Sequence, residues 1–251
     1  MEQARSDVKG SKMRRVFSTL ILVSTTILLS MIAIILYPFD RKGEKVNKIG
    51  RFWAIVNIKA YGIKVHQEGF ENISDPPYIF MCNHQSTLDI FALLSSLRLP
   101  FKWIAKKELF SVPFLGWALK SGRNISLDRE NPRKGLKAMN EAAGKIKDGM
   151  NVVIFPEGTW STDSNLLPFK KGAFSLALRT GVPIIPVGIS GTRKLQPGDC
   201  FIPREKGQVH IKIGKPVYTN QIYTNKEKNS AKVRLMHEVR SRIERLIDSH
   251  G

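Results

Sequence analysis

The chain has 251 residues, of which 42% are hydrophobic, which is enough for one sizeable core and excludes an intrinsically disordered protein. It carries 40 Lys and Arg against 21 Asp and Glu, a formal net charge of +19. We therefore expect an acidic partner, which nucleic acid, an anionic lipid or a polyanionic cofactor would supply. Two cysteines exclude a disulfide framework, and five histidines without an i, i+4 pair predict no metal site.

A long uncharged segment, from Val16 to Phe39, follows the basic residues 1–15. Its 24 residues exceed the roughly 20 that a helix needs to cross a bilayer, whereas the apolar core of a signal peptide has only about 7–15. No small-x-small cleavage motif precedes Asp40. We therefore expect a membrane helix that either spans the bilayer or embeds in one leaflet. Basic residues flank it on both sides, so the positive-inside rule gives no orientation.

A second segment, residues 47–65, mixes aromatic, aliphatic and basic residues at largely helical spacing. This composition is typical of a helix in the membrane interface, beside anionic head groups. The alternative is an amphipathic helix packed on the core, and the neighbouring apolar segment favours the membrane. We expect residues 1–62 to form a basic N-terminus with a membrane-associated two-helix segment, and residues 63–251 to form a separate domain.

From residue 63 onward, strand-like apolar runs alternate with helix-like stretches, which predicts an α/β domain with a central mixed sheet flanked by helices. The expected strands are 63–66, 78–82, 101–105, 124–127, 151–155, 182–189 and 209–213. The expected helices are 86–97, 115–119, 131–149, 171–180 and 230–248. Pro183 and Pro186 have to lie at a strand start, an edge or a bulge. The last helix is expected to bury one apolar face, made of Val233, Met236, Val239, Ile243 and Leu246.

A candidate catalytic pair lies between Asn83 and Asp89, at an expected strand-to-helix turn. His84 and Asp89 would point about 140° apart on a continuous helix and could not meet. They can pair if His84 lies in the loop and Asp89 lies in the first helical turn, with Ser86 as the N-cap. A histidine oriented by a carboxylate is a general base near neutral pH. The alternative is that Asp89 only caps backbone amides, because the Ser86-x-x-Asp89 pattern also resembles a capping box.

A second polar loop follows the expected strand 151–155 and contains Glu157, Gly158 and Thr159. Polar side chains beyond strand ends form the sites of α/β proteins, and glycine permits a positive φ or a close backbone approach. Taken alone, this loop can equally be a plain polar turn. We nevertheless expect these three residues to contribute to substrate binding.

Three basic positions, Lys106, Arg129 and Lys170, also flank expected strands or turns. Each alone is typical of a solvated surface charge, but together they can form a basic mouth that binds phosphate groups. The basic residues are dispersed along the chain without an aromatic-basic motif, so we expect no nucleic-acid partner.

Several blocks between residues 50 and 215 resemble, in order, the glycerolipid acyltransferase family, of the lysophosphatidic acid acyltransferase type. Four of them carry the resemblance: Asn83-His84-x4-Asp89, Gly122 to Arg129, Phe155-Pro156-Glu157-Gly158-Thr159, and Val182-Pro183-Ile184-Ile185-Pro186-Val187. The third block is the most specific, and the ordered set is a far stronger signal than any single member.

The resemblance implies that His84, oriented by Asp89, deprotonates the free 2-hydroxyl of lysophosphatidic acid. The alkoxide would attack an acyl thioester on coenzyme A or acyl carrier protein, giving phosphatidic acid with no acyl-enzyme, cofactor or metal. The basic loops would hold the acceptor phosphate, and the N-terminal segment would place the site at an anionic membrane. We expect the catalytic domain on the cytoplasmic side of that membrane.

One position departs from the family pattern, because Trp160 stands where the third block usually has an arginine associated with the acceptor phosphate. Tryptophan cannot make a bidentate phosphate contact. Either Arg129, Lys106 or Lys170 then carries the phosphate alone, or the acceptor is a different lysolipid. A thioesterase and a basic membrane-anchored lipid-binding module are the competing functions.

Overall fold

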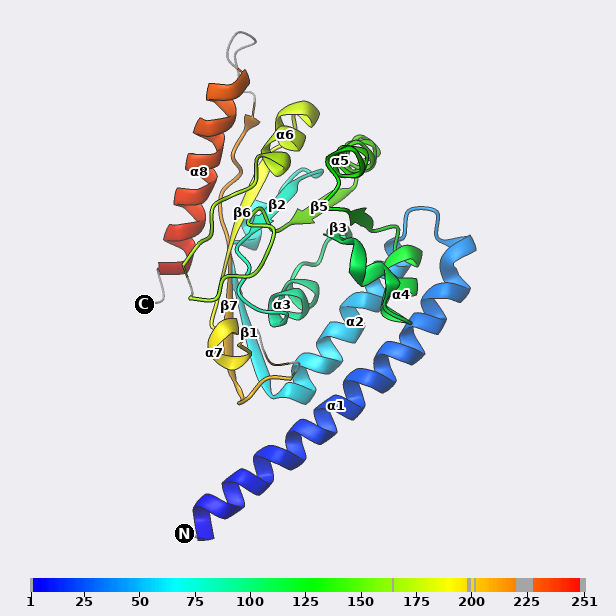
Figure 1. Cartoon of the computed structure of the whole chain (residues 1–251), viewed down its shortest axis with the longest axis vertical. Coiled ribbons are helices and arrows are strands. Elements are labelled where there is room, and N and C mark those ends of the chain that lie inside the picture. Colours follow the sequence, from blue (N-terminus) through cyan, green and yellow to red (C-terminus); the bar gives the residue numbers. More distant parts are fainter. Residues whose placement is uncertain (1, 164, 198–199, 201, 220–227, 249–251) are drawn as a thin grey trace.

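The computed structural model describes residues 2–163, 165–197, 200, 202–219 and 228–248. Within them, a seven-stranded sheet runs in the order β1-β7-β6-β2-β5-β3-β4, with helices on both faces (Figure 1). Neighbouring strands are parallel, except that β6 and β7 are antiparallel. The expected central mixed sheet flanked by helices is confirmed.

All the strands and helices expected from residue 63 onward are present, with ends that differ by a few residues. The strands are β1 (Ile63–Glu68), β2 (Ile79–Cys82), β3 (Phe101–Lys106), β4 (Ile125–Leu127), β5 (Asn151–Ile154), β6 (Ile184–Ser190) and β7 (Gly207–Ile213). The α-helices are α1 (Glu2–Leu36), α2 (Glu44–Tyr61), α3 (Leu88–Ser96), α4 (Leu115–Ser121), α5 (Pro132–Lys147), α6 (Lys171–Thr180), α7 (Thr192–Leu195) and α8 (Lys228–Asp248). Three short 3-10 helices complete the described elements: η1 (Tyr37–Phe39), η2 (Phe70–Asn72) and η3 (Lys107–Ser111).

The sheet separates two apolar layers, because successive side chains of a strand point to opposite faces. In β2, Phe80 and Cys82 pack with α2 and α3, whereas Ile79 and Met81 pack with α5, α6 and α8. All four side chains are fully buried, as expected for a central strand covered on both faces. Burial also raises the pKa of the Cys82 thiol well above its usual value, which agrees with a structural cysteine.

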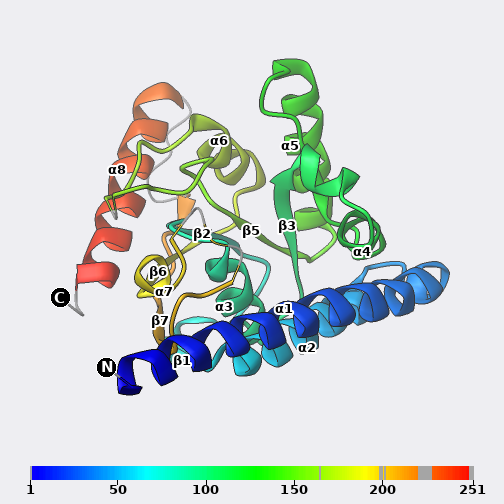
Figure 2. The same cartoon turned by 60° about the horizontal axis from the view of Figure 1, so that its bottom comes forward.

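Helices α1 and α2 run side by side in opposite directions along one side of the domain (Figure 2). Residues 12–39 are the one described stretch that is long and apolar enough for a helix to cross a membrane, and most of their side chains are exposed. α2 lies between α1 and α3. Its Trp53 donates to Thr26 of α1 at 3.0 Å and stacks on Phe91 of α3 at 4.5 Å between ring centroids. One face of α2 is therefore packed on the core, while Phe52 on α2 is exposed.

The two prolines of the β6 region occupy positions that a strand tolerates. Pro183 precedes β6, and Pro186 lies where the pairing with the chain beyond β7 shifts register. Ile184 opposes Val217 and Val187 opposes Ile213, so three steps along β6 match four on the partner. One extra residue therefore bulges out beside Pro186, where the proline has no N–H to donate.

The buried face of α8 differs from the expected one. Val233 is 46% exposed, whereas Leu235 is fully buried. These two residues lie about 200° apart around a helix, so they cannot both face the sheet. The helix turns toward Leu235, which continues a buried row with Val239 and Ile243 at four-residue spacing. The assignment of Val233 to the core face was wrong.

Candidate active site

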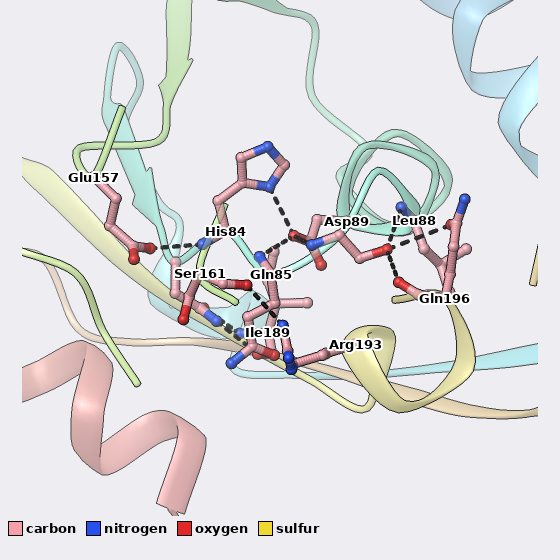
Figure 3. Close-up of polar contacts among 11 residues, drawn as sticks. His84, Gln85, Leu88, Asp89, Glu157, Ser161, Ile189, Arg193 and Gln196 are labelled. Atoms are coloured by element: carbon pink, nitrogen blue, oxygen red, sulfur yellow. Dashed lines mark hydrogen bonds and ion pairs between the residues drawn. The ribbon is translucent and has the colours of Figure 1, made fainter. Parts of the chain in front are cut away.

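The loop between β2 and α3 brings His84 and Asp89 together. Nδ1 of His84 lies 2.8 Å from Oδ2 of Asp89 (Figure 3). The same oxygen accepts the backbone N–H groups of Gln85 at 2.7 Å and Ser86 at 2.9 Å. Asp89 therefore contacts the imidazole and the backbone amides of the loop at once, so the capping contact does not exclude the contact with His84. With Nδ1 donating to Asp89, Nε2 is left unprotonated and able to take a proton.

Ser86 makes the capping contacts of α3. The helix begins at Leu88, and Thr87 before it has helical backbone angles and no side-chain cap bond. The Ser86 N–H donates to Asp89, as in a capping box with Ser86 at the N-cap, so the expected cap is present. The Ser86 hydroxyl accepts the Leu88 N–H at 3.1 Å and donates to the backbone oxygen of Gln196 at 2.7 Å. Its side chain ties the loop to the segment after α7, a long-range contact that local spacing could not predict.

Aromatic rings fix the orientation of the His84 imidazole. The ring stacks on Phe155 with 3.9 Å between centroids and an interplanar angle of 11°. The exposed ring of Trp160 is steeply inclined to it, at 77°, with 6.1 Å between the ring centroids. The second ring nitrogen points away from Asp89 (Figure 3). The imidazole is therefore held between its neighbours, and only a small part of the His84 side chain reaches solvent.

The buried side chain of Glu157 connects the loop that contains His84 with the loop that follows β5. One carboxylate oxygen accepts the His84 N–H and the other accepts the Leu167 N–H, both at 2.8 Å. The side chain is buried, and this burial raises its pKa. Both oxygens thus face the protein backbone. Gly158 follows with φ +79, as its sequence position suggested, and Thr159 is exposed beside it.

Further hydrogen bonds connect the His84 loop and the Glu157 loop to each other and to neighbouring segments. Ser161 N–H donates to the His84 backbone oxygen at 2.8 Å, and Arg193 of α7 donates to the Ser161 backbone oxygen at 2.9 Å. The Asn83 amide exchanges two hydrogen bonds with the Ile189 backbone, at 2.8 and 2.7 Å. Sequence reasoning gave none of these residues a role in holding the site. The position of Asn83 directly before His84 was the available signal, whereas Arg193 offered none.

A groove of about 620 Å³ opens beside this loop and reaches Phe155, the ring on which His84 stacks. Its lining includes apolar side chains from β3, β4, β5, α5 and α6, among them Ile104, Leu127, Leu136, Met139, Ile154 and Leu176. Three cations also line it: Arg129, Lys170 and Arg179. Arg179 is bonded to Asn140 and to the backbone oxygen of Met139 at 2.6 Å.

The three expected basic residues are only partly brought together. Arg129 and Lys170 line the groove with Gly158, whereas Lys106 is exposed 3.7 Å from Glu108 and outside the lining. Asp128, next to Arg129, accepts Lys107 at 3.1 Å. Their contact lowers the pKa of Asp128 and raises that of Lys107.

The geometry is that of one class of enzyme site, in which a histidine paired with a carboxylate lies beside a groove that combines an apolar wall with cations. Such a site can take a proton from a hydroxyl of an anionic amphiphile. Among the residues that the structure describes, no three His, Cys, Asp or Glu side chains gather where they could hold a metal ion.

Comparison with known proteins agrees with this class. The family model described as Acyltransferase matches residues 63–190, just over half of the chain, so the protein belongs to the acyltransferase family. The match begins at the first residue of β1.

The similar proteins within this family have more specific names. The chain is 37% identical over 216 residues to the chloroplastic 1-acyl-sn-glycerol-3-phosphate acyltransferase BAT2 of Brassica napus, covering 83% of this chain and 62% of the relative. A chloroplastic relative of the same name from Arabidopsis thaliana is 36% identical over 216 residues, 83% of this chain and 60% of its own length. The chain thus spans about three fifths of these relatives. The crystal structure of the lysophosphatidic acid acyltransferase PlsC from Thermotoga maritima matches with a TM-score of 0.74 and 28% identity, covering 94% and 97% of the two chains.

Proposed function

We propose that the protein transfers a fatty acyl group from a thioester to the 2-hydroxyl of lysophosphatidic acid, giving phosphatidic acid. The observation that carries the proposal is the His84–Asp89 contact at 2.8 Å beside a groove that offers both an apolar wall and cations. The names of the relatives support the same acceptor.

In this mechanism Nε2 of His84 takes the proton of the acceptor 2-hydroxyl as its oxygen attacks the thioester carbonyl. A C–O bond forms, the tetrahedral intermediate collapses, and the C–S bond breaks. The departing thiolate takes the proton back from His84, so the base is regenerated. Asp89 holds the required tautomer and stabilises the imidazolium while it exists. The thiol belongs to coenzyme A or to acyl carrier protein.

The groove supplies the acceptor's other contacts. Arg129 and Lys170 hold the phosphate by charge-assisted hydrogen bonds, with exposed Lys106 adding positive charge nearby, and the apolar wall holds the acyl chain. Gly158 and Thr159 form the rim between the phosphate and His84. Glu157 acts indirectly, because it positions the backbone of His84.

A different lysolipid is the second candidate acceptor, and Trp160 is the observation that favours it. Its exposed ring stands edge-on to His84, where the family block usually has an arginine. A tryptophan adds apolar contact area at that point but no phosphate contact. We infer that phosphate binding persists through Arg129 and Lys170 and is weaker than in a site with the arginine.

The N-terminal helices place this site at a membrane, where both lipids reside. The apolar helix α1 inserts into the bilayer, and the basic residues around it contact anionic head groups. The catalytic domain faces the cytoplasm, from which the soluble thioester donor arrives.

The decisive experiment offers the purified protein a panel of lysolipids with acyl-coenzyme A and acyl carrier protein thioesters, with products identified by mass spectrometry. We expect phosphatidic acid from lysophosphatidic acid, and loss of turnover but not of lipid binding in His84→Ala. Thioester loss that needs no lysolipid would favour a thioesterase. Lipid binding without any turnover in the unmodified protein would favour a binding module.

A further inference from the structure

An exposed apolar turn lies between η3 and α4, far from the catalytic pair in sequence. We define residues 112–117 as the α4 tip. Val112 is 42% exposed and Trp117 is 46% exposed, and the ring of Phe114 packs edge-on against Trp117 with 5.0 Å between centroids. Apolar side chains that stand exposed on one short turn cost free energy in water.

The backbone of the tip is also strained. Phe114 has φ 62 and ψ −60, and the Leu115 N–H donates to the Pro113 oxygen at 2.7 Å, which makes a γ-turn with a positive φ at its centre. A residue other than glycine rarely adopts these angles. The turn starts α4 directly after η3 and leaves Val112 and Trp117 on the surface.

The helix that carries the tip packs against the apolar helix α1. Helix α4 packs alongside the second half of α1, as both views show (Figures 1 and 2). That half of α1 and the following η1 expose Leu28, Ile35 and Phe39. Lys120 lies three positions after Trp117 on the same side of α4 and is exposed.

Two buried or stacked cations bind α4 to the turn between α1 and α2. Lys102 Nζ donates to the backbone oxygens of Gly43, at 3.0 Å, and Gly122, at 2.9 Å. Arg123 donates to the Tyr37 hydroxyl at 2.7 Å, and its guanidinium lies 3.9 Å from the centre of that ring. The α4 tip and the apolar helices therefore form one rigid unit.

We infer that the α4 tip is a further membrane contact of this protein, in addition to its N-terminal helices. Val112 and Trp117 enter the interfacial region of the bilayer, and Lys120 reaches the lipid phosphates. The packing of α4 on the apolar helix α1 and the tryptophan–lysine pairing favour a lipid surface over a protein partner. The inference rests on the membrane placement of α1 proposed above. A contact at the tip would stop the domain from rotating about α1 and so fix the groove relative to the lipid surface.

The test is fluorescence quenching by vesicles of phosphatidylcholine and phosphatidylglycerol that carry brominated acyl chains. Trp117 and Trp160 are the exposed tryptophans among the described residues, and Trp53 of α2 contacts α1. Trp117→Phe should therefore remove part of the bromine-dependent loss of emission if the tip lies at the interface, while the contribution of Trp53 remains. Equal quenching of the two proteins would overturn the inference.

A matched pair of substitutions separates the tip from general surface effects. Val112→Asp should reduce the quenching, because a carboxylate lifts the tip out of the acyl region. Val233→Asp, at 46% exposure on α8, should leave it unchanged. If Val112→Asp left the quenching unchanged, the inference would also be overturned. Since the readout needs no turnover, a failure of the proposed acyl transfer leaves this test intact.

Discussion

The His84 loop and the groove beside it are built in opposite ways. In the loop, the carboxylates of Asp89 and Glu157 are buried and bonded to backbone amides from other parts of the chain. In the groove, the cations Arg129 and Lys170 are exposed side chains. We therefore expect the loop to set the geometry of the catalytic group and the groove to set the affinity for the acceptor. Substitutions in the loop should lower kcat, and substitutions at the groove should change KM.

The largest expected effect is that of Asp89→Asn. The amide can no longer accept three N–H groups at one oxygen and select the tautomer of His84. We expect kcat to fall by about 10⁴-fold, the scale of the equivalent change in a serine-protease triad. Turnover at saturating acceptor gives the result, and circular dichroism checks the fold. A variant with near-normal kcat would show that Asp89 serves only as a cap.

Glu157→Gln should come next. One end of the amide would present N–H atoms to a backbone N–H, so one of the two loops must move. We expect a fall in kcat of about 10²-fold, because small displacements of a catalytic group have this scale. The control is Glu141→Gln, which changes an exposed glutamate on α5 paired with Lys145. If acceptor KM changed instead of kcat, Glu157 would be a substrate contact, as the sequence first suggested.

Trp160→Arg tests the expectation that changes near the groove alter KM rather than kcat. An arginine can form charge-assisted hydrogen bonds with the acceptor phosphate, so we expect the KM for lysophosphatidic acid to fall about tenfold with little change in kcat. Thr162→Arg adds the same charge two positions later on the exposed loop and should have a smaller effect. Unchanged acceptor affinity and preference would show that this position does not read the phosphate.

Substitution of Lys102 should have the smallest effect on turnover, but it should change the stability of the fold measurably. Burial lowers its pKa from 10.5 to about 8, and a neutral amine still has two N–H groups for its two carbonyl partners. Between pH 8 and 10.5 the unfolded chain binds more protons than the folded one, so stability rises with pH in this window.

The measurement compares the unfolding free energies of the wild type and Lys102→Met across that window. We expect the difference to grow in favour of the wild type by about 3 kcal/mol. Other titrating groups cancel in the subtraction. A pH-independent difference would place the lysine in a hydrated environment.

Sequence patterns predicted the features that depend on neighbouring residues. The strands follow from apolar runs, the α5 cap follows from Asn131 before Pro132, and the catalytic pair follows from a five-residue spacing at a strand-to-helix turn. Each of these needs only local geometry. The bulge beside Pro186 was one of the three positions expected for a strand proline, together with a strand start and an edge.

The rest depends on contacts between distant segments. Lys102 lies in a strand pattern that gave no sign of burial, and its partners, Gly43 and Gly122, come from the helical turn and the end of α4. The Glu157 contacts to His84 and Leu167 are equally non-local. Leu235 rather than Val233 lies on the buried face of α8, and this could be known only from the position of the sheet against that helix. No spacing rule contains this information.

The pairing of β1 with β7 has a consequence for the order of assembly. β1 follows directly from the apolar helices, and its partner in the sheet begins at Gly207, near the other end of the chain. During synthesis the N-terminal helices emerge first, while the strand that fastens them to the sheet emerges late. Helices α1 and α2 can therefore contact a bilayer before the sheet is complete. Until β7 has been synthesised, β1 lacks its partner strand.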